Sequence, residues 1–300
     1  DMMHICPMDF DEFIMASAQP RLVDILESAD WGMIDILKTK FIDLLRQYYF
    51  VGGMPEVVAN YMEHHNLQEV REKQNEILDA YRRDISKHTT ASESIRIGHV
   101  LNSLPSQLAK ENQKFIYSVI KKGARAAEYE LAIQWLIDAG LIYKVERNRE
   151  SAVPLSFYAD SSIFKLFMLD CGLMGALAQT PPREVLIGNN IFSEYKGSFT
   201  ENYVMQQLCT FRNLPLYYYS KDSSTQEIDF IAQIGSRVVP IEVKAEENVK
   251  AKSLQAFINN DQKQYNLKGL RFSMKSYIDQ GWMENVPLYA VDSFIDSLLV

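Results

Sequence analysis

The 300-residue sequence has few cysteines, and they form no recognisable site. The three cysteines, Cys6, Cys171 and Cys209, are too far apart in the sequence to form a C-x-x-C motif. An odd number of cysteines also cannot all be paired in disulfide bonds within the chain. Scattered cysteines of this kind are typical of a reducing compartment. A basic leader followed by an apolar segment is also missing, so the sequence predicts a cytoplasmic protein without a targeting signal.

Long apolar runs are missing as well. No stretch reaches the roughly 18–20 residues that a membrane-spanning helix needs, so a membrane partner is not expected. The phosphate-binding loop G-x-x-x-x-G-K-(S/T) does not occur either. Since the sequence opens at Asp1 like a fragment whose beginning lies elsewhere, we expect that this chain alone does not hydrolyse ATP.

Basic residues are outnumbered, with 31 lysines and arginines against 39 aspartates and glutamates and a net charge of −8. This balance argues against a protein whose whole surface binds nucleic acid, although a local basic groove is compatible with it. With 47% hydrophobic and 23% charged residues, disorder is excluded. The length suits one large domain or two to three ordinary ones.

The first ninety residues predict helices and no complete sheet of their own. Helical patterns cover residues 31–49, 56–63 and 67–87, and Asp30 is a suitable N-cap for the first. Gly52-Gly53 interrupts the pattern before Pro55, which can open the next helix.

From residue 94 onwards the pattern changes. Three short helices at 95–104, 114–122 and 127–139 precede two strands at 141–147 and 155–159, an order typical of a winged helix. DNA contact is favoured by the basic residues Lys121, Lys122, Arg125, Arg147 and Arg149. Glu128 and Glu130 on the candidate recognition helix would repel phosphate, so a module that contacts only protein is the alternative.

A third region follows the linker at Thr180-Pro181-Pro182. It predicts helices at 197–211 and 252–263, a strand at 216–220, a hairpin at 228–243, strands at 269–274 and 286–291, and a terminal helix. Such alternation indicates a mixed sheet flanked by helices. We therefore predict an α+β multidomain protein, with domains at 1–92, 93–180 and 181–300.

The hairpin of this region carries charge inside its strands. Asp229 lies between Ile228 and Phe230, while Glu242 and Lys244 bracket Val243 and, by strand alternation, share one face. Burying such groups costs several kcal/mol unless they pair with each other or hold a metal. The hairpin is thus either a salt-bridged structural core or a metal site.

Glu201, on the predicted helix upstream, adds a third acid. A helix glutamate, a strand aspartate and a strand E-x-K form the pattern of a Mg²⁺-dependent phosphodiesterase, because Mg²⁺ prefers hard oxygen ligands. Asp229, Glu242 and Glu201 would be the metal ligands, and Lys244 would stabilise the transition state. A buried ion network without a metal is the structural alternative.

Several stretches together resemble a known family. They are Cys6–Phe13, Phe50–Val58, Tyr81–Lys87, Leu104–Phe115, Phe164–Leu173, Glu201-Asn202, Glu227–Phe230 and Pro240–Lys244. The chain resembles a bacterial and archaeal family of AAA-type ATPases carrying a C-terminal domain of unknown function, and its third region is similar to the PD-(D/E)XK nuclease-like superfamily.

This resemblance implies particular domains and partners. Residues 1–92 would be the end of the ATPase core with its helical lid, 93–180 a winged-helix-like domain, and 181–300 a restriction-endonuclease-like domain. It implies a Mg²⁺ cofactor, DNA as a partner, and ATP only with a P-loop domain ahead of residue 1. The alternative is a non-catalytic regulatory module that binds a protein partner or self-associates, which the acidic charge favours.

Overall fold

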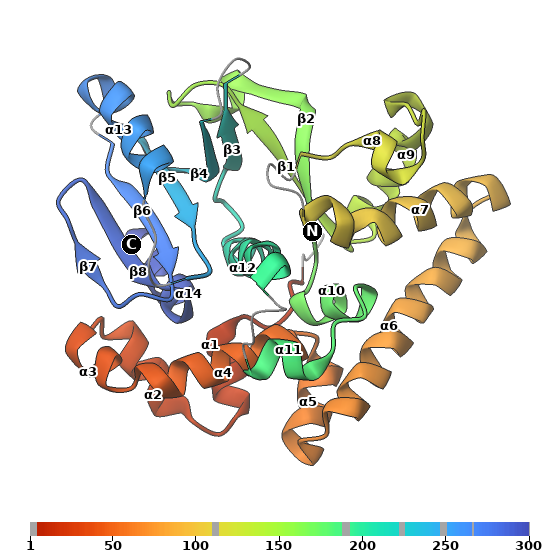
Figure 1. The fold of residues 1–300 in the computed structure, drawn as a ribbon, viewed down its shortest axis with the longest axis horizontal. Helices are drawn as coiled ribbons and strands as arrows, with labels where there is room; N and C mark the ends of the chain where they lie inside the picture. The colour runs from red at the N-terminus through yellow and green to blue at the C-terminus, as the bar shows by residue number, and fades with distance from the viewer. Residues whose placement is uncertain are drawn as a thin grey trace.

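One eight-stranded mixed sheet organises the fold (Figure 1), which confirms the α+β class. The computed structural model describes residues 5–109, 114–187, 193–221, 226–246, 251–265 and 267–299. The sheet has the order β2-β1-β3-β4-β5-β6-β8-β7. Its strands are β1 Ile142–Asn148, β2 Ala159–Met168, β3 Leu216–Ser220, β4 Glu227–Ile234, β5 Arg237–Val243, β6 Gly269–Ser273, β7 Ile278–Asp279 and β8 Met283–Pro287.

The N-terminal region is helical, as predicted. Its helices are α1 Phe10–Ala16, α2 Pro20–Glu27, α3 Trp31–Ile36, α4 Lys38–Val51, α5 Pro55–His64 and α6 Leu67–His88. The side chain of Asp30 caps α3 by accepting a hydrogen bond from the amide of Met33, and Pro55 opens α5. The predicted helix 31–49 is divided at Leu37, which ends α3 and precedes α4.

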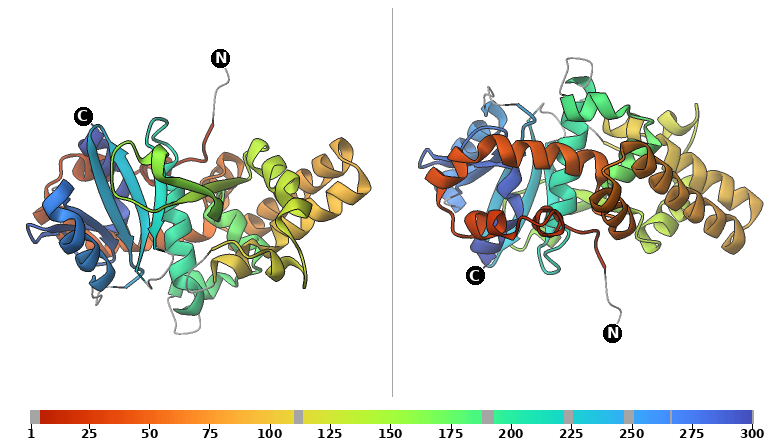
Figure 2. Two further views of the ribbon diagram at one scale, coloured as in Figure 1. Left: turned by 90° about the horizontal axis from the view of Figure 1, so that it is seen from above. Right: turned by 90° about the horizontal axis from the view of Figure 1, so that it is seen from below.

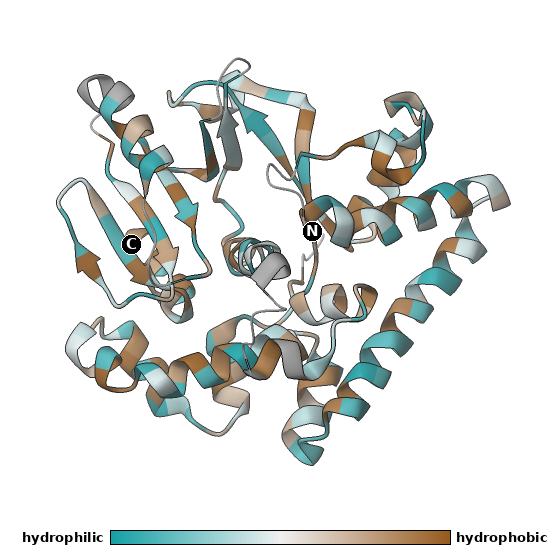
Figure 3. Ribbon diagram, in the orientation of Figure 1, coloured by the Kyte–Doolittle hydropathy of each residue, from teal (hydrophilic) through white to brown (hydrophobic). Residues whose placement is uncertain are grey.

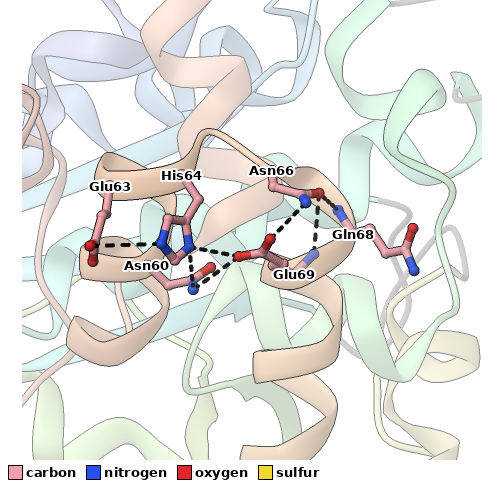
Figure 4. Close-up of polar contacts among 6 residues, drawn as sticks. All are labelled: Asn60, Glu63, His64, Asn66, Gln68 and Glu69. Atoms are coloured by element: carbon pink, nitrogen blue, oxygen red, sulfur yellow. Dashed lines mark hydrogen bonds and ion pairs between the residues drawn. The ribbon is translucent and has the colours of Figure 1, made fainter.

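His64, the last residue of α5, has a structural role (Figure 4). His64 Nδ1 lies 2.7 Å from Glu69 Oε2 in the first turn of α6, and Asn66 caps α6 by accepting from the amides of Gln68 and Glu69. His65 ends α5 in the left-handed conformation. These contacts fix the turn between the two helices.

The helices of the middle region are α7 Ala91–Leu108, α8 Tyr117–Ile120 and α9 Ala126–Asp138. Together with α6 they lie at the end of the molecule opposite β5–β8 (Figure 2). The second strand predicted for the wing is wrong, because 155–158 forms a short 3-10 helix and β2 begins only at Ala159. Moreover, β1 pairs in parallel with β3, so this ribbon continues the C-terminal sheet.

Two helices cover the C-terminal part of the sheet on opposite faces. α12 (Ser193–Leu208) packs through Tyr203, Val204 and Leu208 in the main core, which includes Ile241 and Phe272. α13 (Lys252–Tyr265) packs through Leu254, Phe257 and Ile258 in a second cluster with strands β4 and β5. The predicted strand 286–291 is shorter and earlier, because the chain leaves β8 after Pro287 and enters α14 (Val291–Leu299).

The helices differ in how polar they are (Figure 3), and α6, the longest, carries many hydrophilic residues along its length. In the described part of the chain, none combines the length and the apolar character that crossing a membrane requires.

A buried polar junction joins α4, α10 (Cys171–Leu177) and α12. Asp170 accepts hydrogen bonds from the amide of Gly53 at 2.6 Å, the amide of Leu173 at 2.8 Å and Gln206 Nε2 at 3.0 Å. A Cβ on Gly52, whose φ is +79°, would lie 2.2 Å from Asp170 Oδ1. Glycine at this break thus allows the close approach of the Asp170 carboxylate to the backbone.

Two acids meet where α1 packs against α14. Asp11 accepts a hydrogen bond from Ser293 Oγ at 2.8 Å, and Asp292 is the residue before Ser293 in α14. Burial raises the pKa of Asp11 to about 7. Burial, and then the charges of Asp9 and Asp11, raise the pKa of Asp292 to about 8. The folded chain therefore retains protons that the unfolded chain, with an aspartate pKa of about 3.9, has already released.

Because the folded-state pKa values are raised, stability is lost as the pH rises from about 4 to about 8. Asp292→Asn removes one of these groups, so the melting temperature of the variant is expected to exceed that of the parent chain at pH 8.5 by about 2 °C or more. The difference should shrink towards pH 5. Thermal unfolding at both pH values measures it, with the exposed Asp138→Asn as control. A constant difference at the two pH values would contradict the assignment.

Candidate active site

The charged hairpin forms as predicted, with Gly235-Ser236 as the turn between β4 and β5. Phe230 on β4 pairs with Ile241 on β5, and Asp229 and Glu242 are the next residues along the two strands. Asp229 Oδ2 accepts a hydrogen bond of 2.7 Å from the amide of Val243, between the two residues of the E-x-K motif. The aspartate is therefore fixed directly beside the second strand.

A β-bulge determines where Asp229 lies. Tyr217 pairs with Ile231 and Tyr219 with Ile228, so β4 carries an extra residue at Asp229–Phe230. Bulges of this kind redirect side chains and are frequent beside active sites.

Glu242 and Lys244 contact each other, as strand alternation predicts. Lys244 Nζ lies 3.3 Å from Glu242 Oε1, and the glutamate side chain is only 6% exposed. Glu242 Oε2 is buried without a hydrogen-bond partner among the residues that the structure describes. An acceptor left in this state costs free energy, so it is a natural position for a ligand.

Glu201 reaches the same neighbourhood from α12, and it contacts a residue outside the predicted set. Lys165 on β2 lies 3.9 Å from Glu201 Oε2 and 2.6 Å from Glu227 Oε1. The lysine side chain is 1% exposed, and its Nζ lies 5.0 Å from the centre of the Tyr218 ring. A buried ammonium group requires such partners.

The pKa shifts show that these groups form one electrostatic cluster. Burial and the charge of Asp229 raise the pKa of Glu201 to about 8, although Lys165 and Lys244 oppose the rise. Burial also raises the pKa of Glu242, against the opposing charge of Lys244. For both lysines burial alone would lower the pKa, but the surrounding carboxylates raise it overall.

The metal-ligand set predicted from Asp229, Glu242 and Glu201 is not preformed. Within the described ranges, no group of three or more histidine, cysteine, aspartate or glutamate side chains is arranged to hold a metal ion. Asp229 and Glu242 fit a hard cation best, because they lie side by side and Glu242 has an oxygen without a partner. The role of Glu201 as third ligand stays a prediction.

Lys165 and Glu227 belong to the cluster, although the sequence pattern did not indicate them. Lys165 stands inside the apolar run Phe164–Met168, which is the same signal that drew attention to Asp229 in its own strand. The pairing that brings β2 into the C-terminal sheet could not be foreseen, so the lysine had no visible partner.

The two arginines of the predicted basic wing share one carboxylate, which offsets one of their two charges. Arg147 and Arg149 both contact Asp160 at 2.5 Å, and Arg147 is buried. Hydrogen bonds from Ser162 and from the two arginines hold the pKa of Asp160 well below its usual range. A groove of about 630 Å³ lies beside this loop, where Phe157 is 81% exposed. Arg149 lines it, but none of the predicted catalytic or metal-binding residues does.

Lys121, Lys122 and Arg125, just before α9, are exposed. DNA contact in this region therefore stays a prediction that rests on these three residues.

Two family models match different parts of the chain. Residues 42–184 match a family model described as a domain of unknown function (DUF8612). Residues 196–290 match DUF4143. This second domain of unknown function is found in AAA-ATPase-associated proteins. No curated protein and no solved structure matches the chain.

The charged cluster spans both matched regions. Lys165 belongs to the DUF8612 match, whereas Glu201, Asp229, Glu242 and Lys244 belong to the DUF4143 match. The DUF4143 match is consistent with the C-terminal domain of unknown function that the resemblance implied.

Proposed function

We propose that the DUF4143 region is a Mg²⁺-dependent phosphodiesterase that acts on nucleic acid. The observation that carries the proposal is the hairpin site, in which Asp229 and Glu242 lie on paired strands and Lys244 lies 3.3 Å from Glu242. The partnerless buried oxygen of Glu242 supports it, because a cation held there would satisfy this acceptor.

Each residue of the hairpin has a distinct role in this proposal. Asp229 and Glu242 would hold Mg²⁺, which supplies an activated water and neutralises charge on the phosphate. The amide of Val243 keeps the Asp229 carboxylate oriented towards the second strand. The ammonium group of Lys244 binds a phosphate oxygen and stabilises the charge that develops there. Glu201 closes the site from the α12 side.

The finer fold and the parent protein are part of the same proposal. A PD-(D/E)XK nuclease-like fold is supported by α12, β4 and β5 carrying Glu201, Asp229 and the E-x-K motif in that order. A winged-helix-like module is supported by α7–α9 followed by the β1–β2 ribbon. An AAA-type ATPase parent is supported by the DUF4143 match. DNA is the partner that we propose for the nuclease-like and winged-helix-like parts.

Nucleotide hydrolysis is not expected of this chain. Without G-x-x-x-x-G-K-(S/T) there is no loop of amides and no lysine to bind the phosphates of ATP. The purified chain should release no phosphate from ATP above the buffer background in a coupled assay. Turnover that co-purifies with the chain through several columns would refute this expectation.

A non-catalytic regulatory module is the second candidate function. The specific observation in its favour is that lysines of the chain itself already pair with the acids of the cluster. Lys165 contacts Glu201 and Glu227, and Lys244 contacts Glu242. The net charge of −8 also favours a protein partner over DNA. In that case the hairpin would hold the fold together, and the chain would bind a partner or itself without cleaving a substrate.

The decisive experiment incubates the purified chain with supercoiled, linear and single-stranded DNA in Mg²⁺ and, separately, in EDTA. The proposal expects nicks or breaks that need Mg²⁺ and disappear in EDTA. Cleavage that is equal in both buffers would not come from this site. Mn²⁺, which can replace Mg²⁺ and can be counted directly, provides a separate binding measurement. Intact DNA of all three forms, together with no Mn²⁺ bound to the chain, would favour the regulatory module.

A further inference from the structure

Lys165 reaches the acid cluster from a different part of the chain than the other members. It lies on β2, at one end of the sheet order, whereas Asp229 and Glu242 lie on β4 and β5. Its side chain is 1% exposed, and its ammonium group contacts Glu227 at 2.6 Å and Glu201 at 3.9 Å. Lys165 is therefore a buried member of the cluster and not a surface lysine that lies close to it.

The two lysines divide the cluster into two parts. Lys244 lies beside Glu242, and Asp229 is fixed next to them by the amide of Val243. Lys165 contacts the other two carboxylates, Glu227 and Glu201. Asp229 lies near enough to both lysines to interact with each of them electrostatically.

Metal-dependent phosphodiesterases use one or two divalent ions, and a second ion needs carboxylate ligands of its own. Here the second pair of carboxylates is already held by a cation that cannot leave. An ammonium group within 4 Å of Glu201 and Glu227 would also repel a divalent ion at that position, and burial strengthens the repulsion.

We propose that Lys165 is the fixed cation of this site: it occupies the carboxylates that a second metal ion would need, so the site binds one divalent ion, on Asp229 and Glu242. This inference rests on the proposed metal-binding function of the hairpin. It makes Lys165 a positioning residue that sets metal stoichiometry, and it assigns a role in the DUF4143 site to a residue of the DUF8612 region.

The test counts Mn²⁺ ions bound to the whole chain at pH 7.5 by electron paramagnetic resonance. Only ions that are lost when Asp229→Asn and Glu201→Gln are introduced together are assigned to the site. The unchanged chain is expected to bind one ion and Lys165→Met two. Lys144→Met is the matched control, because Lys144 pairs with Glu146 in the same sheet but outside the cluster, and it should bind one ion.

Each outcome decides something. Two ions in the unchanged chain, or one ion in folded Lys165→Met, would overturn the inference and leave the proposed function in place. No ion in the unchanged chain would overturn both. If Lys165→Met does not fold, Lys165→Gln removes the charge but keeps a polar amide that can donate a hydrogen bond to Glu227, and it leaves both carboxylates in place. Two ions are again expected there, and one would overturn the inference.

Discussion

Replacing Lys244 by alanine is expected to lower Mg²⁺-dependent DNA cleavage by at least about 100-fold, because a preorganised cation beside the reacting phosphate is lost. The ammonium group lies 3.3 Å from Glu242 Oε1, and its side chain is 34% exposed, so it can reach a substrate. Asp229→Ala should lose activity to at least the same extent, since it removes a metal ligand. Initial rates on a supercoiled plasmid measure both effects.

Two controls make this result interpretable. Lys144→Ala removes a lysine that pairs with a glutamate in the same sheet, and it should keep its activity within about twofold. Circular dichroism and melting curves show whether Lys244→Ala is folded. If both site variants cleave as fast as the parent chain, the activity comes from a contaminating nuclease and the site assignment fails.

Asp170→Ala is expected to destabilise the fold by about 3 kcal/mol or more. The substitution leaves three buried donors without their acceptor, namely the amides of Gly53 and Leu173 and the side chain of Gln206. Each unsatisfied buried donor costs about 1–3 kcal/mol. Chemical denaturation followed by circular dichroism gives the difference in unfolding free energy.

The exposed Asp138, at the end of α9, is the matched control for this prediction. Among the residues that the structure describes, its side chain accepts a hydrogen bond only from the exposed Gln134, so Asp138→Ala should change the unfolding free energy by less than about 0.5 kcal/mol. Equal effects of the two substitutions would show that the junction around Asp170 does not stabilise the fold as its contacts indicate.

Local features of the fold could be predicted from the sequence because they depend on neighbouring residues. Asp30 caps a helix, Pro55 opens one, and Gly235, with a φ of +60°, forms the turn of the hairpin. The Glu242–Lys244 contact follows from the alternation of side chains along one strand. Each of these needs only a few residues of context.

Other features depend on pairing between distant segments, and the sequence pattern does not contain that information. The run Val286–Val291 is apolar enough for a strand, yet the chain leaves the sheet after Pro287 and turns helical. The bulge at Asp229 arises from the register between β3 and β4. Lys165 enters the cluster only because β1 pairs with β3, which carries the ribbon into the C-terminal sheet.

That parallel pairing of β1 with β3 also has a consequence for folding during synthesis. The β1–β2 ribbon is complete at Met168, long before the ribosome has made β3 at Leu216–Ser220. Until β3 arrives, the inner edge of β1 has no neighbour, and open strand edges attract other chains. Lys165 also lacks its partner Glu227 until β4 has been made. The interval between these two strands is therefore a stage at which the nascent protein is exposed to misassembly.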